Sequence, residues 1–294
     1  MEYFDQGLPF YKGNLHMHTT ASDGVLSPQE AEAVYRDRGY DFIAITDHRR
    51  RTADTHWNQR MLVLPGIELD YALGNQLVHL VGIGVGAGID GDVGRINGPQ
   101  EGVRRLKAHG AYVILAHPAW SLNTTETLLS LQGLDAAEVY NGVSRPPFSG
   151  DRADSTVLLD MAAANGRLLN SVAADDSHWY KGEECSGFIR LQAKELSEQA
   201  VMEALRAGRY HASCGPEIHS LRIQGDTLSV TCSPVEHIVI LSNMPWTPDR
   251  NFHGEGITRA EYRINRNAFW PETFVRVVLI DRDGKKAWSN PIPV

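Results

Sequence analysis

The sequence has few cysteines and no long apolar run. Its three cysteines, Cys185, Cys214 and Cys232, are an odd number without the Cys-x-x-Cys spacing of metal or redox motifs. This excludes a disulfide framework and favours a reducing compartment, so a cytoplasmic protein is expected. No stretch reaches the roughly 18 consecutive apolar residues of a membrane-spanning helix. Residues 1–18 also lack the basic-then-apolar pattern of a secretory leader.

Basic residues are in the minority. The 294 residues include 28 Lys and Arg against 36 Asp and Glu, which gives a net charge of −8. This balance disfavours nucleic acid and anionic membranes as partners, because both are bound through basic surfaces. With 42% hydrophobic and 22% charged residues, the composition is that of a globular protein. A small-molecule substrate is the expected partner, and nothing in the sequence indicates an oligomeric state.

Short apolar runs alternate with helical patterns over the first two-thirds of the chain. Ser27-Pro28-Gln29-Glu30 has the pattern of a capping box, and it opens a helix that Gly39 ends. Residues 99–109, 151–165 and 197–208 also show helical spacing of apolar residues. Most of the expected strands are nearly continuous in Ile, Leu, Val and Ala, as in parallel sheets covered on both faces. They are 14–18, 41–48, 61–69, 76–85, 111–118, 136–141, 167–178 and 187–192.

These repeated units predict an α/β fold, and seven or eight strands in about 210 residues favour a barrel. After Gly215-Pro216 the pattern changes to alternating strands with turn signals such as Asp283-Gly284-Lys285. This change predicts a barrel domain at 1–213 and a small antiparallel β domain at 214–294. The irregular stretch at 141–154 directly follows a strand, where barrels carry their active-site loops.

Histidine is the unusual residue, with 12 in the chain. His16 and His18 end the first strand, and residues i and i+2 of an extended chain point to the same side, so both can bind one metal ion. Asp176 and His178 form a second such pair. Further ligand-type residues, nearly all at strand ends, are Asp23, His48, Glu68, His79 and His117. Nine groups indicate two or three divalent ions that share ligands, of the Zn, Mn or Fe type.

Each residue taken alone has a simpler explanation. His79 lies in an apolar strand, as a hydrogen-bonded core histidine would, and Asp23 in Ser-Asp-Gly is typical of a turn. Glu68 alone is compatible with an ordinary strand-end charge, and Asp47 points away from the face of His48. The gathering at strand ends, where barrels have their active sites, favours metal binding. The other histidines are expected at the surface or in packing: His56, His109, His211, His219, His237 and His253.

Six motifs, in this order, resemble the motif set of the PHP (polymerase and histidinol phosphatase) superfamily over residues 13–192. They are HMHTTASDG (16–24), ITDH (45–48), PGIE (65–68), VHLVGIG (78–84), AHP (116–118) and DDSH (175–178). EVYNG (138–142), ALRAGRYHASCGP (204–216) and the β-rich tail are similar to the two-domain bacterial members related to the CehA/McbA metallohydrolases.

The resemblance implies a distorted (β/α)7 TIM-like barrel with up to three metal ions at the C-terminal ends of its strands. It assigns nine ligands by motif position, with Glu68 bridging two ions. The first ion takes His16, His18, Glu68 and Asp176, the second Glu68, His79 and His117, and the third Asp23, His48 and His178. Asp175 is the alternative to Asp176, which the i, i+2 relation to His178 favours.

The predicted function is a metal-dependent phosphoesterase that hydrolyses a small phosphate ester through a hydroxide bridging the metals. Phosphate favours arginine, whose planar fork of donors matches it. The candidates are Arg49, directly after His48, and Arg145, in the loop after EVYN. His178 could also protonate the leaving group as a general acid. Asn141 and Trp120 are expected to line the pocket.

Two other functions stay open. The CehA-like resemblance implies that the same metal centre could hydrolyse carbamates, carboxylic esters or amides. The barrel could instead be a non-catalytic, metal-stabilised binding module, which the full set of ligands disfavours. A nuclease role is disfavoured by the charge of −8 and the lack of a basic stripe.

Overall fold

The helices begin and end close to the local sequence signals. Ser27 Oγ accepts from the backbone N–H of Glu30, and the Glu30 carboxylate accepts from the N–H of Ser27, which confirms the predicted capping box. The computed structural model describes residues 2–4, 7–267 and 269–294. Its helices are α1 (Pro28–Asp37), α2 (Pro99–Ala108), α3 (Thr125–Ser130), α4 (Thr156–Ala164) and α5 (Glu198–Arg206), with short 3₁₀ turns η1 (Ala87–Gly91) and η2 (Val93–Arg95).

Two helix expectations need correction. The helix expected at 151–165 begins only at Thr156, because Asp154 accepts the N–H of Thr156 at 2.8 Å and holds the preceding residues in a loop. The six-residue α3 has no counterpart among the sequence expectations. Of the described residues, no helix has both the length and the apolar character that crossing a membrane requires.

Up to residue 213 the strands form a mixed sheet. They are β1 (Phe10–Asn14), β2 (Phe42–Ile45), β3 (His56–Asn58), β4 (Met61–Leu73), β5 (Gln76–Ile83), β6 (Tyr112–Leu115), β7 (Ala136–Asn141), β8 (Asn170–Ala174), β9 (Phe188–Gln192) and β10 (Tyr210–Ser213). The main path runs β10-β9-β1-β2-β4-β5-β6-β7-β8, and β3 pairs with β4. This confirms the mixed α/β class.

The expectation of parallel strands is wrong for β5 and β9. The strands β1, β2 and β4 pair in parallel, as do β6, β7 and β8. In contrast, β5 is antiparallel to both β4 and β6, and β9 is antiparallel to β1. For β5 the reason is local: Gly74, with a φ of 61°, and Asn75 form a two-residue turn that makes β4 and β5 a hairpin.

The two ends of the run from β1 to β8 meet beyond their last residues. Met17 and Ser177 form a parallel bridge, His18 donates its N–H to Ser177 O at 2.9 Å, and Asp176 donates to His16 O at 2.9 Å. The segments that follow β1 and β8 are therefore side by side. Closure of the seven strands into a full barrel stays a prediction.

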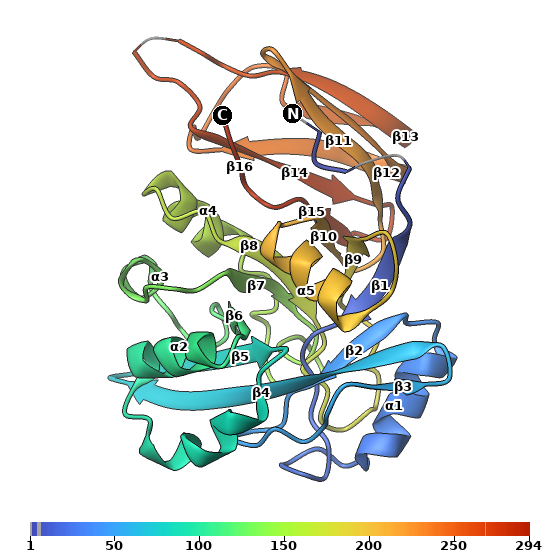
Figure 1. The fold of residues 1–294 in the computed structure, drawn as a ribbon. Coiled ribbons are helices and arrows are strands. Elements are labelled where there is room, and N and C mark those ends of the chain that lie inside the picture. Colours follow the sequence, from blue (N-terminus) through green and yellow to red (C-terminus); the bar gives the residue numbers. More distant parts are fainter. Residues whose placement is uncertain (1, 5–6, 268) are drawn as a thin grey trace.

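The C-terminal strands continue the same sheet through antiparallel pairs. They are β11 (Ile218–Gln224), β12 (Thr227–Ser242), β13 (Asn251–Arg263), β14 (Phe274–Ile280), β15 (Lys286–Trp288) and β16 (Ile292–Pro293). The long β12 pairs with β11, β13 and β14, and β15 joins them to β10. Figure 1 shows these strands as a separate layer above the helices and strands of the first part. The domain boundary at residue 213 stays a prediction.

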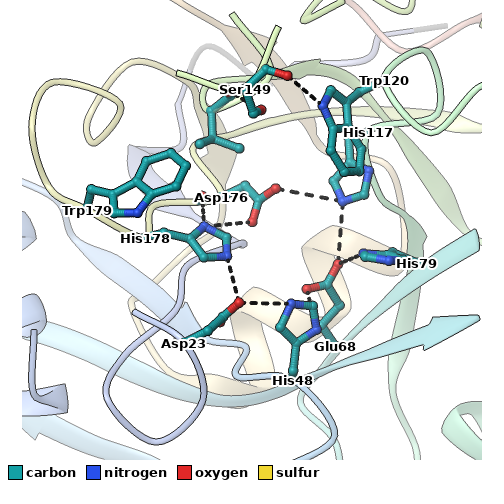
Figure 2. A pocket seen from close by; sticks show the side chains of 11 residues that line it. Asp23, His48, Glu68, His79, His117, Trp120, Ser149, Asp176, His178 and Trp179 are labelled. Carbon is teal, nitrogen blue, oxygen red and sulfur yellow. Dashed lines mark hydrogen bonds and ion pairs between the residues drawn. The ribbon is translucent and has the colours of Figure 1, made fainter. Parts of the chain in front are cut away.

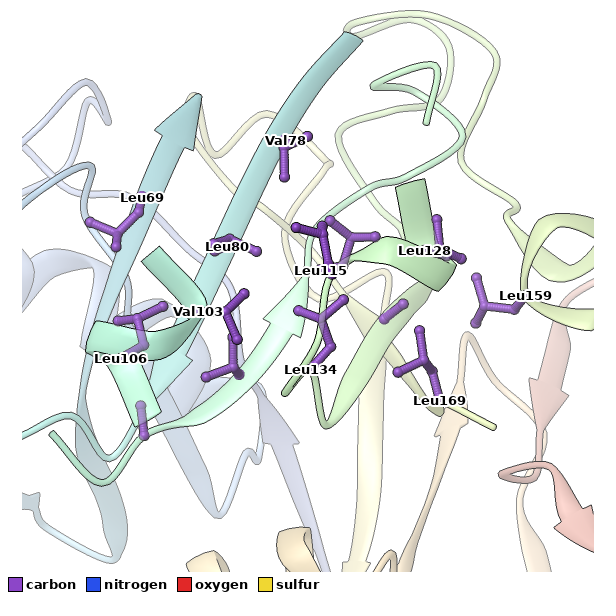
Figure 3. Packing of buried hydrophobic residues seen from close by; sticks show 14 of the residues in the cluster. Leu69, Val78, Leu80, Val103, Leu106, Leu115, Leu128, Leu134, Leu159 and Leu169 are labelled. Atoms are coloured by element: carbon purple, nitrogen blue, oxygen red, sulfur yellow. The ribbon is translucent and has the colours of Figure 1, made fainter. Parts of the chain in front are cut away.

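The first part of the sheet is buried on both faces. Val78 and Leu80 of β5 pack outward with α2, α3 and α4, as Figure 3 shows, while Val81 and Ile83 belong to the inner cluster. Alternate residues of β6 divide in the same way, with Val113 outside. Because both faces exclude water, polar side chains have little room except at the strand ends.

A buried arginine joins the C-terminal layer to the first part. Arg276 on β14 has no exposed surface, and its Nη1 donates to Ser171 Oγ on β8 at 2.7 Å. Its Nε lies 3.0 Å from Asp160 Oδ1 on α4. A fully buried guanidinium without a counter-charge is strongly unfavourable, so Asp160 stabilises this junction.

Asp160→Ala should therefore lower the free energy of unfolding by about 3 kcal/mol, since it leaves Arg276 buried and unpaired. Adding Arg276→Met to Asp160→Ala should recover part of the loss. The matched control is Asp226→Ala, which breaks an exposed pair with Arg266 and should cost less than about 1 kcal/mol. Denaturant unfolding measures all three variants, and equal losses for Asp160→Ala and Asp226→Ala would contradict the assignment.

Candidate metal centre

The nine residues predicted as metal ligands gather at one end of the sheet. The segments after β1, β2, β6 and β8, together with residues of β4 and β5, bring them together. Most of them line one cavity, as Figure 2 shows, whereas His16 and His18 are fully buried beside Glu68 and Asp176. The nine residues form three overlapping groups in which the ligand atoms lie within 4.8 Å of one another. The groups are His16, His18, Glu68 and Asp176; Glu68, His79 and His117; and His18, Asp23, His48 and His178.

The innermost group is the most deeply buried. Glu68 Oε2 lies 3.3 Å from His16 Nε2 and 3.1 Å from His18 Nε2. Asp176 Oδ1 lies 3.2 and 3.1 Å from the same two nitrogens. Two carboxylate oxygens and two imidazole nitrogens thus surround one point.

The other two groups extend from this centre. Glu68 turns its second oxygen, Oε1, toward His79 Nδ1 at 2.9 Å and His117 Nε2 at 3.5 Å, so its two oxygens face different groups. At the opening of the cavity, Asp23 Oδ2 lies 3.5 Å from His178 Nε2 and 3.7 Å from His48 Nε2. The Asp23 side chain is 54% exposed, so this third group borders solvent.

His18 also takes part in the third group, which the motif assignment does not include. Its Nδ1 lies 3.5 Å from Asp23 Oδ1, while its Nε2 faces Glu68 and Asp176. One imidazole therefore contacts two of the three groups, through different nitrogens.

The donor set fits divalent metal ions. Glu68 Oε2, Asp176 Oδ1 and His48 Nδ1 are buried without a hydrogen-bond partner in the described part of the chain. Imidazole nitrogens lie close to the two carboxylate oxygens, and His48 Nδ1 lies 3.3 Å from Glu68 Oε2. Buried polar atoms are nearly always hydrogen-bonded, and unpaired ones point to a missing ion. Nitrogen and oxygen ligands at about 2.0–2.2 Å from an ion lie about 3–3.5 Å apart, as these atoms do.

The charges of the cluster are strongly interdependent. Burial alone would lower the pKa of His18, but the carboxylates of Asp176 and Glu68, 3.1 Å from its Nε2, raise it to about 9. Burial alone would likewise raise the pKa of Glu68 and of Asp176, but the surrounding histidines hold both below the usual range. Without a metal, the site therefore holds ionised carboxylates that keep protons on neighbouring imidazoles.

A second layer of polar residues orients the ligands. Glu138 Oε1 lies 2.7 Å from His16 Nδ1, which places the proton on that nitrogen and turns Nε2 toward the cluster. Glu138 Oε2 accepts from the His117 N–H and from Asn141 Nδ2, both at 2.8 Å. Asn141 also donates to Asp176 Oδ2 at 3.2 Å. Glu138 is not among the residues predicted for the site, although a carboxylate within the apolar run AAEVYN is a signal for such a role.

Asp175 and Asp176 face different surroundings. The Asp175 carboxylate accepts the backbone N–H groups of Cys185, Ser186 and Gly187 at 2.7–2.8 Å, away from the cluster. Burial raises the pKa of Asp175 to about 6 in spite of these donors. The expected strand at 167–178 ends at Ala174, and Asp176 has a φ of 56°, so the i, i+2 argument does not apply here. A turn brings Asp176 to the metal ligands instead.

The two arginine candidates do not line the cavity. Arg49 donates from Nε to Asp70 Oδ1 at 2.9 Å, and Arg145 donates from Nη2 to Gly182 O at 2.6 Å. The cavity, of about 270 Å³, has Trp120, Val143, Ser149 and Trp179 as its wall beside the metal-ligand candidates. Of the two residues expected to line the cavity, Trp120 does so, whereas Asn141 lies behind Asp176 and does not. The six other histidines stand outside the three groups found among the described residues.

One of the comparisons with known proteins bears on the fold. No protein-family model matches the chain. An uncharacterized protein of Methanocaldococcus jannaschii is 24% identical over 165 residues, which cover 51% of this chain and 93% of that protein. A solved two-domain protein of Bacteroides vulgatus, described as containing a predicted PHP-like metal-dependent phosphoesterase, has a TM-score of 0.52 and 18% identity over 98% of this chain and 96% of its own. The PHP-like fold expected from the motifs is thereby confirmed.

A weaker structural match comes from Chromobacterium violaceum. It is an amidohydrolase solved with bound sulfate and without metal, with a TM-score of 0.47 and 16% identity over 58% of this chain and 89% of its own.

Glu138→Gln should weaken metal binding about tenfold to a hundredfold. The amide must direct its NH₂ either at the His16 Nδ1 proton or at the His117 and Asn141 donors, so one donor always meets another. Competition with a chromophoric chelator measures the affinity, and Glu126→Gln on the exposed face of α3 is the matched control. Equal metal affinities of the Glu138→Gln variant and the wild type would contradict the proposal that Glu138 orients the ligands.

Metal uptake by the metal-free protein should release protons. The pKa of His18 lies near 9 without metal, and binding requires its neutral form. Apparent affinity should therefore rise as the pH increases from about 7 to 9, by up to tenfold per pH unit for each proton displaced. Calorimetry in buffers of different ionisation enthalpy counts the protons released on metal binding. A metal affinity that does not change with pH would contradict a protonated His18 in the metal-free protein.

Proposed function

We propose that this chain is a metal-dependent hydrolase of the PHP superfamily that acts on a small phosphate ester. The observation that carries the proposal is the set of nine ligand-type residues in three overlapping groups beside one cavity, with buried oxygens of Glu68 and Asp176 that lack hydrogen-bond partners among the described residues. Perturbed carboxylates and imidazoles in a cavity are typical of catalytic sites. The cavity of about 270 Å³ suits a small molecule.

We assign the metal ligands as the motifs predict. His16, His18, Glu68 and Asp176 would hold one ion, and Glu68, His79 and His117 a second. Asp23, His48 and His178 would hold a third, with His18 Nδ1 close to the same position. Divalent ions such as Zn, Mn or Fe, when bound, supply Lewis acidity that activates water and neutralises charge on the substrate.

His178 has one nitrogen available for chemistry. Its Nδ1 lies 2.8 Å from Asp176 O and donates to that carbonyl, so only Nε2 faces the cavity near Asp23. Ligation needs a lone pair on Nε2, whereas general-acid catalysis needs a proton there. The two roles proposed for His178 therefore exclude each other at any one moment, and ligation is the resting role.

Arg49 and Arg145 remain the proposed contacts for a phosphoryl group. Arg145 is held by Gly182 O and stacks on Phe148 at 5.2 Å, next to the wall loop that contains Ser149. It would have to rotate to reach the substrate. Arg145→Ala should then lower kcat/KM for a phosphate ester and leave metal content unchanged.

The second candidate is hydrolysis of a carbamate, carboxylic ester or amide at the same metals. The observation that favours it is the charge of the wall, since the described residues that line the cavity include no lysine or arginine. A dianionic phosphate usually attracts such a side chain, whereas a neutral carbonyl substrate does not need one.

A substrate panel tests the proposal. The protein is loaded with Mn, Zn or Fe and assayed on alkyl phosphomonoesters and alkyl carbamates, before and after chelation. Phosphate release that is lost on chelation and restored by metal supports the phosphoesterase. Hydrolysis of carbamates alone would transfer the assignment to the second candidate, and an inert metal-loaded protein would overturn the proposal in favour of a binding module.

Asp176→Asn should abolish metal retention and hydrolysis, because Asp176 Oδ1 lies within 3.2 Å of the Nε2 atoms of both His16 and His18 in the innermost group. Asp175→Asn is the matched control. It should keep its metals and lose about 1–3 kcal/mol of stability, because three backbone donors lose an anionic acceptor. Metal analysis and unfolding of both variants decide the matter, and metal loss confined to Asp175→Asn would reverse the assignment.

A further inference from the structure

We propose that the site selects substrates whose leaving group carries an aromatic ring, held by Trp120 and Trp179. This inference rests on the proposed hydrolase function, and it concerns only the part of the substrate that does not react.

The wall of the cavity has an apolar character that the metal ligands do not require. Four lining residues lie outside the ligand set: Trp120, Val143, Ser149 and Trp179. Figure 2 shows Trp179 on one side of Asp176 and Trp120, with His117, on the other. An indole on either side of the reacting centre provides flat apolar surfaces for a ring.

Two side-chain donors of this wall, on Trp120 and Ser149, are already paired within it. Trp120 Nε1 donates to Ser149 O at 2.9 Å, and Ser149 Oγ donates to Val143 O at 2.8 Å. These donors are therefore not free for the hydroxyl groups of a sugar or of glycerol. A polar leaving group would lose hydrogen bonds to water without replacement, which disfavours its binding.

The ring of Trp120 and the backbone next to Trp179 are held in place before a substrate arrives. The ring of Trp120 meets that of His117 edge to face, with centroids 5.0 Å apart and planes at 81°. Trp179 is on a turn whose backbone N–H groups are bound by the buried Glu183, which accepts from Tyr180 at 2.6 Å and from Lys181 at 2.9 Å. A wall held in this way loses little conformational entropy on binding.

Trp179 nevertheless leaves much of its ring uncovered. It is 41% exposed, and its ring centroid is 5.8 Å from that of His178, so the free surface adjoins the reacting centre. Covering such a ring with a second aromatic group is favourable through both apolar burial and stacking. The cavity of about 270 Å³ has room for an aromatic ring.

The test compares leaving groups of similar basicity, so that intrinsic reactivity does not decide the result. The metal-loaded protein is assayed on benzyl, ethyl and glycerol phosphates, or on the corresponding carbamates if the substrate panel favours them. We expect kcat/KM for the benzyl ester to exceed that for the ethyl ester by about tenfold, the size of one favourable aromatic contact. Glycerol phosphate should be the poorest of the three.

Variants of Trp179 then test whether this side chain causes the preference for the benzyl ester. Trp179→Leu should lower kcat/KM for the benzyl ester about tenfold and leave the ethyl ester within about twofold. Trp179→Phe, which keeps a ring, should retain most of the preference. Trp246→Leu is the matched control, because Trp246 is 74% exposed and does not line the cavity.

Binding of non-hydrolysable analogues separates this inference from the proposed function. Calorimetry with benzylphosphonate and ethylphosphonate on the metal-loaded protein should show tighter binding of the benzyl compound, and Trp179→Leu should abolish the difference. Equal binding of both compounds, or equal loss for both esters in Trp179→Leu, would overturn the inference while hydrolysis itself stands. An inert protein that still prefers benzylphosphonate would overturn the hydrolase proposal and support the aromatic site.

Discussion

Two buried carboxylates, Glu68 and Asp176, direct oxygen atoms at the same imidazoles without forming hydrogen bonds to them. Burying such anions costs several kcal/mol each unless positive charge compensates. Protons on the histidines compensate in the metal-free state, as the raised pKa of His18 shows. Divalent ions can replace those protons, because their ligands must be neutral imidazoles and ionised carboxylates. The same electrostatic demand thus explains the unusual charges and the proposed chemistry, and Glu138 extends it outward by fixing the His16 tautomer.

Much of this site could be predicted from the sequence, for a physical reason. The strands β4 to β8 are buried on both faces, so histidines and carboxylates stand out against continuous apolar runs. His48 and His117 follow the apolar strands β2 and β6, His16 and His18 follow β1, and the structure brings the four together. Glu138 sits inside its run and was missed, because a single buried carboxylate gives no spacing pattern, and its partners His16 and His117 are distant in sequence.

Other features depended on contacts or turns that apolar patterns do not encode. The direction of β5 follows from the two-residue turn at Gly74, and a buried strand has the same pattern in either direction. Asp176 reaches the cluster through a positive φ rather than through the alternation of an extended strand. The arginines were placed by proximity in sequence to His48 and EVYN, but ion pairing with Asp70 and the carbonyl of Gly182 directs their side chains elsewhere.

The floor and the wall of the cavity are built in different ways. The floor consists of residues at strand ends, whose positions are fixed by the sheet and by Glu138 and Asn141 behind them. The wall comes from loops that satisfy their own polar groups, through Ser149 and Val143 on one side and Glu183 on the other. Because these loop contacts do not include the ligand atoms, a change in the wall can alter the leaving group that fits without disturbing the metals. Under the proposed function, rate and selectivity would depend on separate sets of residues, as expected where a rigid scaffold carries the chemistry and loops carry the specificity.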